Sequence, residues 1–274
     1  MLSEMMIYDA AKFRLGSAKV RRKNMLITQR VAAEALKKAH GLSIADLCIG
    51  VGYTGVKLSN GAGGTCFTFR HELGLKCGPI QGAGTMIGMP AAVAVEMAMS
   101  TNLAEASIGV AAINAILNDN FDAGKDAVDV MDIREPDTVG MIGYFYPVVK
   151  QIKDTVDKLY IFERNITEEG LLPDWCENIY LPECDVVLIT GVTFINKTID
   201  HVLSLCRNAK EVVIMGASTC MAPDVLKDYG VTILAGSRVT DPDKLLRVIA
   251  QGGGGLDVQN YTQKLCMRIT ERRR

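Results

Sequence analysis

The chain has 274 residues, enough for about two domains, and 49% of them are hydrophobic while 6% are aromatic. Thirty Lys and Arg side chains balance 31 Asp and Glu side chains, which leaves a formal net charge of −1. Because this charge offers no general attraction for anions, we expect neither nucleic acid nor an anionic membrane as a partner.

The first half of the chain predicts an α+β domain over residues 1–133. Apolar residues recur at helical spacing before Gly41, alternating segments that read as strands follow, and Ala-rich helical segments come last. Asn60-Gly61 between two of the alternating segments is a hairpin signal, which predicts an antiparallel meander. The expected helices are 7–40, 91–100 and 103–117, and the expected strands are 44–51, 54–59 and 65–70.

The second half predicts an α/β domain over residues 134–274. Apolar runs rich in β-branched residues alternate with helical segments, a pattern typical of a parallel sheet with helices on both faces. The glycines at 252–255 form a break, and the spacing of the apolar residues after them predicts a last helix. The expected strands are 138–142, 158–162, 185–190, 211–215 and 231–234; the expected helices are 147–156, 195–207, 223–228 and 241–251, and the last helix carries Val258, Tyr261, Leu265 and Ile269 on one face.

The remaining composition indicates a soluble, cytoplasmic protein. The amino terminus lacks the pattern of a secretory signal, and the apolar stretch 86–99 is interrupted by Pro90 and Glu96 and is too short to span a bilayer. Eight cysteines are scattered without a C-x-x-C pair, as expected of reduced thiols. The densest group of metal-ligating types is Cys66, His71, Glu72 and Cys77, whose spacing does not fit a zinc site, so we predict no metal site made by the protein.

Four of the apolar runs give way to Gly, Ser or Thr. They occupy residues 139–145, 186–193, 212–219 and 231–237. Open α/β sheets bind ligands at the carboxyl ends of their parallel strands, where glycine lets the backbone approach closely. These endings therefore predict a small-molecule site.

The first ending carries the features of a nucleotide-binding turn. Gly140 and Gly143 precede Tyr144, and Glu163 ends the next strand about 20 positions later, where dinucleotide- and adenosyl-binding folds place an acid against ribose. The third glycine of the motif is missing. The alternative is a tight turn beside a solvated Glu163.

The second ending, residues 191–198, has the outline of a phosphate-binding P-loop. Asn196 stands where the second glycine belongs, which argues against a nucleoside triphosphatase. We expect instead that Thr190, Asn196 and Thr198 present a hydroxyl, an amide and free N–H groups to a smaller polar or anionic ligand. At the third ending no G-x-S-x-G motif surrounds Ser218, so hydrogen bonding or helix capping is favoured over a nucleophile.

Several of these segments together resemble a known pair of families. A resemblance to the DUF364 family of heavy-metal chelation domains is carried by residues 190–200, by 215–219 with Pro223, and by 235–243 with the glycines that follow. The segments 51–56 and 111–115 resemble its companion domain DUF4213. The resemblance implies an α/β protein in which a smaller α+β, enolase-N-like domain precedes a Rossmann-like parallel-sheet domain, with the site between them.

The resemblance also implies a function linked to heavy-metal chelation. The first hypothesis is an enzyme acting on a flavin-, pterin- or siderophore-like chelator precursor in the interdomain cleft. The alternatives are a non-catalytic binder of a metal chelate and an S-adenosylmethionine-dependent transferase, so that S-adenosylmethionine or a metal chelate is the cofactor to consider; whether the chain is an enzyme, and whether it forms a homo-oligomer, stay open. The implied ligand-binding residues, with Tyr144 and Glu163 added from their positions, are Asn114, Gly140, Gly143, Tyr144, Glu163, Thr190, Gly191, Asn196, Thr198, Gly216, Ser218 and Thr219.

Overall fold

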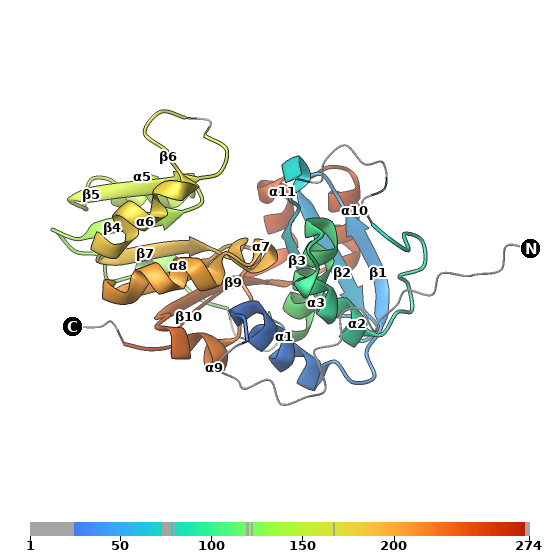
Figure 1. The fold of residues 1–274 in the computed structure, drawn as a ribbon. Helices are drawn as coiled ribbons and strands as arrows, with labels where there is room; N and C mark the ends of the chain where they lie inside the picture. Colours follow the sequence, from blue (N-terminus) through green and yellow to red (C-terminus); the bar gives the residue numbers. More distant parts are fainter. Residues whose placement is uncertain are drawn as a thin grey trace, which may run out of the picture. The chain divides into compact units, whose positions relative to one another are not determined.

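A computed structural model describes residues 25–72, 78, 80–118, 121, 123–166 and 168–271 (Figure 1). The part of the first expected helix before residue 25, as well as Cys77, lies outside the described residues. The chain forms two compact units: Met1–Asp119 with Val239–Thr262, and Asn120–Arg238 with Gln263–Arg274. The boundary at 133/134 stays a prediction, and the structure adds that each compact unit is built from two separate stretches of chain.

The first unit contains the expected antiparallel meander. Strands β1 (Ile44–Ile49), β2 (Tyr53–Leu58) and β3 (Gly63–Phe67) pair in that order. Asn60 and Gly61 close the turn between β2 and β3: Gly61 adopts φ +89°, and the Asn60 side chain accepts a hydrogen bond from the Ala62 N–H at 3.1 Å. The turn chemistry of the sequence thus sets the register of this hairpin.

Close helix packing in the first unit depends on glycines. Its helices are α1 (Ile27–Lys38), α2 (Ala91–Glu96), α3 (Leu103–Leu117), α10 (Pro242–Ala250) and α11 (Gly255–Gln259). A Cβ on Gly64 of β3 would lie 2.1 Å from the Ala111 carbonyl oxygen of α3, and one on Gly50 would lie 2.4 Å from the Ile249 carbonyl oxygen of α10. These approaches let α10, which lies late in the sequence, pack on a sheet formed early in it.

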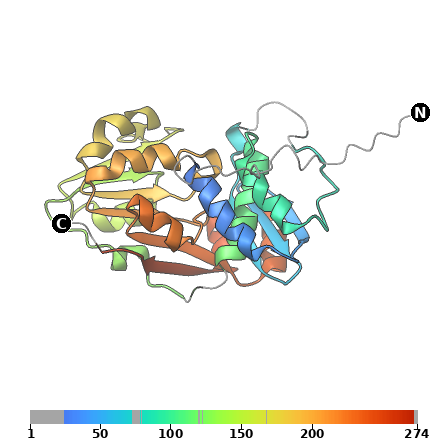
Figure 2. The same cartoon turned by 60° about the horizontal axis from the view of Figure 1, so that its bottom comes forward.

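The second unit is built on a seven-stranded sheet in the order β10-β9-β8-β7-β4-β5-β6 (Figures 1 and 2). The pairs from β4 to β9 are all parallel, which confirms the predicted α/β class. Its strands are β4 (Thr138–Ile142), β5 (Lys158–Glu163), β6 (Leu172–Pro173), β7 (Val186–Thr190), β8 (Glu211–Met215), β9 (Ile233–Val239) and β10 (Thr262–Arg268). Its helices are α4 (Ala127–Val130), α5 (Tyr146–Ile152), α6 (Glu177–Tyr180), α7 (Thr193–Asn196), α8 (Ile199–Leu205) and α9 (Pro223–Leu226).

Both faces of this sheet are covered. Val139, Leu188, Val213 and Ile233 are fully buried in one cluster, together with residues of α4 and α5. On the other face α6 and α8 lie side by side (Figures 1 and 2), and the chain after α6 packs so tightly on β4 that a Cβ on Gly140 would lie 2.7 Å from Leu181 Cδ2. Burial on both faces explains why these strands read as continuous apolar runs.

The strand order places a topological switch point between β4 and β7. After β4 the chain adds β5 and β6 on one side, and it then returns to add β7, β8 and β9 on the other. The connections therefore leave β4 and β7 in opposite directions. Open α/β sheets bind their ligands at such a point, at the carboxyl ends of the strands.

The predicted last helix is wrong. The glycine break is followed by the short helix α11, and Thr262–Arg268 then form the edge strand β10. Thr240 N–H bonds the Tyr261 carbonyl and Ile269 N–H bonds the Thr232 carbonyl, so β10 runs antiparallel to β9. Leu265 is buried in β10, and this tertiary burial outweighs a helical spacing that so short a segment also permits.

Within the described part of the chain, no helix is both long and apolar enough to cross a membrane.

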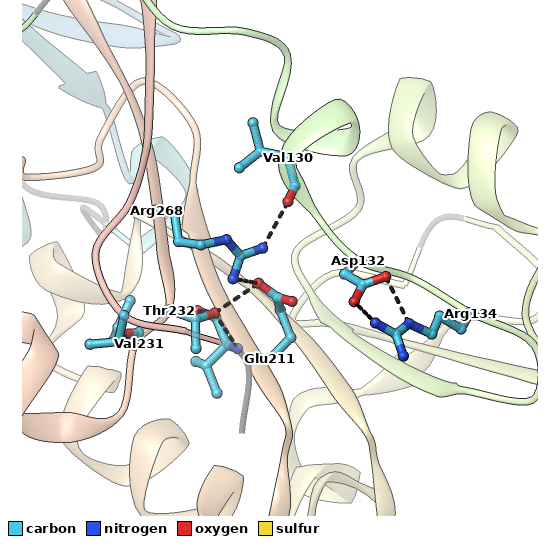
Figure 3. A network of polar contacts seen from close by, with 9 residues as sticks. Val130, Asp132, Arg134, Glu211, Val231, Thr232 and Arg268 are labelled. Atoms are coloured by element: carbon cyan, nitrogen blue, oxygen red, sulfur yellow. Dashed lines mark hydrogen bonds and ion pairs between the residues drawn. The ribbon is translucent and has the colours of Figure 1, made fainter. Parts of the chain in front are cut away.

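A buried ion pair ties β10 to the amino-terminal ends of β8 and β9 (Figure 3). Glu211 is 0% exposed, and its Oε1 lies 2.8 Å from Arg268 Nη1 and accepts a hydrogen bond from Thr232 Oγ1 at 3.1 Å. Arg268 Nη2 also donates to the Val130 carbonyl at 2.8 Å. This network holds β10, the edge strand that the sequence pattern did not predict, against the rest of the sheet.

We predict that Arg268→Met will lower the free energy of unfolding by about 3–5 kcal/mol, because it leaves the buried Glu211 carboxylate without its counter-charge. The matched control is Lys264→Met on the same strand, whose ion pair with Asp126 is solvent-exposed. That change should cost about 0–1 kcal/mol. Urea unfolding of both variants measures the difference, and equal effects would contradict the role of the buried pair.

Candidate functional site

At the switch point, the carboxyl ends of β4 and β7 are in contact. Ile142 of β4 pairs with Ile189 of β7, so the next residues, Gly143 and Thr190, meet at the edge of the sheet. Gly143 has φ +87°, and a Cβ placed on it would lie 3.0 Å from the Thr190 Cβ. The backbone conformation favours glycine here, and a Cβ would also press on the Thr190 side chain.

Glu163 holds the turn that follows β4. The Gly143 N–H donates to the Phe162 carbonyl at 2.9 Å, and the Tyr144 N–H donates to Glu163 Oε1 at 2.6 Å. These two hydrogen bonds join β4 to the neighbouring strand β5 beyond their last paired residues. The carboxylate has a clear structural role as a backbone anchor, and its predicted contact with a ribose stays a prediction.

Tyr144 stands beside this turn with an exposed aromatic neighbour. Its ring makes an edge-to-face contact with Tyr146, with 6.2 Å between the centroids. Burial, followed by a hydrogen bond with the Glu168 carboxylate, raises the pKa of the Tyr144 hydroxyl above its ordinary value. The phenol therefore stays protonated at neutral pH, and its O–H is donated to the Glu168 carboxylate.

The segment after β7 is a helical turn and not a phosphate loop. The N–H groups of Phe194, Ile195 and Asn196 in α7 donate to the carbonyls of Gly191 and Val192, which precede it. The expected free N–H is wrong for Asn196, because the turn uses it together with those of Phe194 and Ile195. The same bonds give a physical reason for rejecting a triphosphate site, which needs such donors.

Hydrogen bonds from its own side chains fix the rest of this segment. Thr190 Oγ1 accepts from the Val192 N–H at 3.3 Å. Asn196 Oδ1 accepts from both the N–H and the hydroxyl of Thr198, at 3.1 and 2.8 Å. The three predicted polar residues therefore shape the segment, and their contact with a ligand stays a prediction.

Lys197, between Asn196 and Thr198, is a residue that the sequence did not single out for the site. Its backbone lies in the left-handed region, with φ +62°. The side chain is half-buried, and this burial lowers its pKa from 10.5 to about 8. No residue pattern forecasts a lysine in a conformation that favours glycine or asparagine.

The end of β8 packs directly against the end of β7. A Cβ on Gly191 would lie 2.4 Å from the Thr219 nitrogen, so the two connecting segments touch backbone to backbone. Gly216 has φ +107° and faces the Phe145 ring, while Ser218 and Thr219 are buried. The glycines thus allow the two segments to pack closely, and this packing buries Ser218 and Thr219.

Two of the predicted site residues have packing roles elsewhere. Gly140 lies inside β4, with Leu181 and Cys184 against it. Asn114 lies in α3 of the first unit, is 1% exposed, and donates from Nδ2 to the Thr65 carbonyl at 3.0 Å. A ligand contact of either residue stays a prediction.

The side chains of the described residues do not form a metal centre by themselves. In that part of the chain, no group of three or more His, Cys, Asp or Glu residues could hold a metal ion. Burial raises the pKa of the Cys184 thiol to about 12 and that of Cys266 to about 11, and it also raises that of Cys66. Because the thiolate is the metal-binding form, these buried thiols are poor ligands at neutral pH.

The fold and the glycine-lined switch point define an α/β protein with a Rossmann-like parallel-sheet domain and a smaller α+β domain before it. Residues 126–268 match the family model DUF364 and residues 32–117 match DUF4213, each described as "Putative heavy-metal chelation". The DUF364 match alone covers more than half of the chain. The chain belongs to the DUF364 family.

Individual relatives agree with this assignment. An uncharacterized protein of Methanocaldococcus jannaschii is 33% identical over 185 residues, which are 64% of this chain and 70% of the relative. Crystal structures of two DUF364 proteins of unknown function, each 27% identical, have the same fold. The Pyrococcus horikoshii structure has a TM-score of 0.79 and covers 89% of this chain and 100% of its own; the Desulfitobacterium hafniense structure has a TM-score of 0.76 and covers 88% and 98%.

We predict that Gly143→Ala will destabilise the protein more than Gly170→Ala. The two glycines have nearly the same φ, +87° and +86°, but a Cβ on Gly170 meets nothing within 4 Å. The left-handed backbone should cost each variant about 1–2 kcal/mol, and the Thr190 contact should add about 1–3 kcal/mol in Gly143→Ala alone. Urea unfolding gives both values, and equal losses would mean that the ends of β4 and β7 are not in tight contact.

Proposed function

We propose that this protein binds a flavin-, pterin- or siderophore-like chelator, or its precursor, at the carboxyl ends of β4, β7 and β8, as the substrate of a conversion linked to heavy-metal chelation. The proposal rests on the close contact between Gly143 and Thr190, which brings the carboxyl ends of β4 and β7 together at the switch point. This is the place in an open α/β sheet at which small molecules bind. The family descriptions supply the link to heavy metals.

A chelator supplies the metal ligands that the described side chains do not. No three-ligand group exists among the described residues, and the pKa values of the buried thiols are raised. A metal ion that arrives in an organic chelate needs only groups that recognise the chelate. Hydroxyls, an amide and backbone groups around a glycine-lined edge do this by hydrogen bonding.

The groups at this edge suit a polar molecule. Thr190 and Thr198 bring hydroxyls, each of which can accept further hydrogen bonds, and Asn196 brings an amide. Tyr144 adds a phenol that stays protonated, and the exposed Tyr146 ring beside it offers an aromatic surface for a planar ring. This set can orient a heterocycle that carries polar substituents.

A second candidate is an S-adenosylmethionine-dependent transferase, which the position of Glu163 favours. This carboxylate ends the strand next to β4 and lies beside the turn at Gly143, where an adenosyl-binding fold places its ribose-binding acid. One of its oxygens bonds Tyr144 N–H, and a carboxylate can accept several further hydrogen bonds. The two candidates use the same edge of the sheet and differ in the molecule bound.

Native mass spectrometry of freshly purified protein distinguishes them. We expect an organic molecule, with or without its metal ion, to co-purify with the wild-type chain and with Gly170→Ala, and to be lost from Gly143→Ala. S-adenosylmethionine or S-adenosylhomocysteine in its place would favour the transferase. Bare metal without an organic molecule, or equal retention by Gly143→Ala and Gly170→Ala, would contradict the proposal.

The same experiment separates an enzyme from a carrier. The molecule released from the protein should change in mass after incubation with fresh wild-type protein if the chain converts it. An unchanged mass is the result expected of a carrier, or of an enzyme that co-purifies with its product.

A further inference from the structure

Large apolar side chains are exposed where three neighbouring strands end. Tyr146 follows β4, Ile166 follows β5 and Trp175 follows β6, and these side chains are 60%, 50% and 71% exposed. The three strands are parallel neighbours in the order β4-β5-β6, so all three residues follow the same edge of the sheet (Figure 1). A single exposed apolar side chain is ordinary, but three at adjacent strand ends beside a candidate site indicate an interaction surface.

The edge has a different character on the other side of the switch point. In the segments 190–198 and 216–222, which follow β7 and β8, no large apolar side chain is exposed. These segments instead bring the hydroxyls of Thr190 and Thr198 and the amide of Asn196. The switch point therefore separates an apolar half of the edge, after β4, β5 and β6, from a polar half, after β7 and β8.

The Tyr146 ring is held in place although it is exposed. Its backbone begins α5, and its ring makes an edge-to-face contact with the ring of Tyr144. Tyr144 is bonded at both ends, because its N–H donates to Glu163 and its hydroxyl donates to Glu168. A ring that is already positioned loses little conformational freedom when a ligand packs against it.

The width of the apolar half indicates the kind of group that it can take. Neighbouring strands lie about 4.8 Å apart, so the ends of β4 and β6 are separated by about 10 Å. A fused heterocycle of two or three rings has a similar length, and its flat face can stack on an aromatic ring such as that of Tyr146. An open-chain hydroxamate siderophore offers no such face.

We propose that the apolar half of the edge is a subsite for a planar fused ring of the ligand, with Tyr146 as the residue that stacks on it. This inference rests on the proposed function. The polar and metal-binding groups of the ligand then lie over the polar half, after β7 and β8. The substrate class is therefore a chelator built on a flat conjugated ring system and not an open-chain siderophore, and Tyr146 determines this specificity.

A fluorescence titration with riboflavin as the probe tests this assignment, because a tyrosine that stacks on the flavin ring quenches its fluorescence. Tyr146→Leu should bind riboflavin roughly 5- to 100-fold more weakly than the wild-type protein, the loss typical of one stacking contact, and should quench it less. Tyr146→Phe keeps an aromatic ring and should bind within about threefold of wild type. Ile179→Ala removes an equally exposed apolar side chain from α6 and should bind as wild type does.

Thermal unfolding separates stacking from a structural role of the ring. Because the Tyr146 side chain is exposed, Tyr146→Leu should melt within about 2 °C of the wild-type protein. Weaker riboflavin binding together with a clearly lower melting temperature would show that the ring supports the turn, and would overturn the proposal. So would wild-type protein that does not bind riboflavin, or Tyr146→Leu that binds riboflavin as tightly as wild type.

Failure here is distinguishable from failure of the proposed function. A wild-type protein that co-purifies with an organic molecule without a fused ring, or that binds the open-chain siderophore desferrioxamine but not riboflavin, would remove this subsite and leave the proposed function standing. A wild-type protein that co-purifies with no small molecule would remove the proposed function itself.

Discussion

The second unit depends on the absence of side chains where its central strands end. Gly143 faces Thr190 across the end of the β4–β7 pair, and Gly191 faces the Thr219 backbone across the end of the β7–β8 pair. A Cβ on Gly191 would clash with the Thr219 backbone, and one on Gly143 would press on the Thr190 side chain. Because β4, β7 and β8 are held so closely, the polar residues that follow them lie together at the carboxyl ends of the strands, where open α/β sheets bind their ligands.

Much of this arrangement could be predicted from the sequence, because local patterns and tertiary packing agree. The apolar runs predicted the parallel strands β4, β5, β7, β8 and β9 but not the short β6, and Asn60-Gly61 predicted the β2–β3 hairpin. Where the local sequence pattern and the tertiary packing disagree, the prediction fails. The spacing of Val258, Tyr261 and Leu265 indicates a helix, but β10 forms there because Leu265 is buried on the sheet and Arg268 reaches the buried Glu211.

Other features of the structure leave no pattern in the local sequence from which they could be predicted. The return of α10 to the first unit depends on the contact of Gly50 with Ile249, two residues far apart in the sequence. The left-handed backbone of Lys197 is imposed by the end of α7, and a sequence pattern would assign that conformation to glycine or asparagine. At the candidate site, glycines and hydroxyls could be named from the strand endings, whereas the hydrogen bonds that use up the α7 N–H groups required the structure.

Binding of a small molecule at the carboxyl ends of β4, β7 and β8 is the proposal on which the function depends. It can be tested by hydrogen–deuterium exchange of the protein as purified, compared with the same protein after extensive dialysis against a competing chelator. If a molecule is bound there, amide exchange before dialysis should be slower in residues 143–146, 190–198 and 216–219. Equal exchange there, or protection confined to the opposite end of the sheet around Glu211, Thr232 and Arg268, would contradict it.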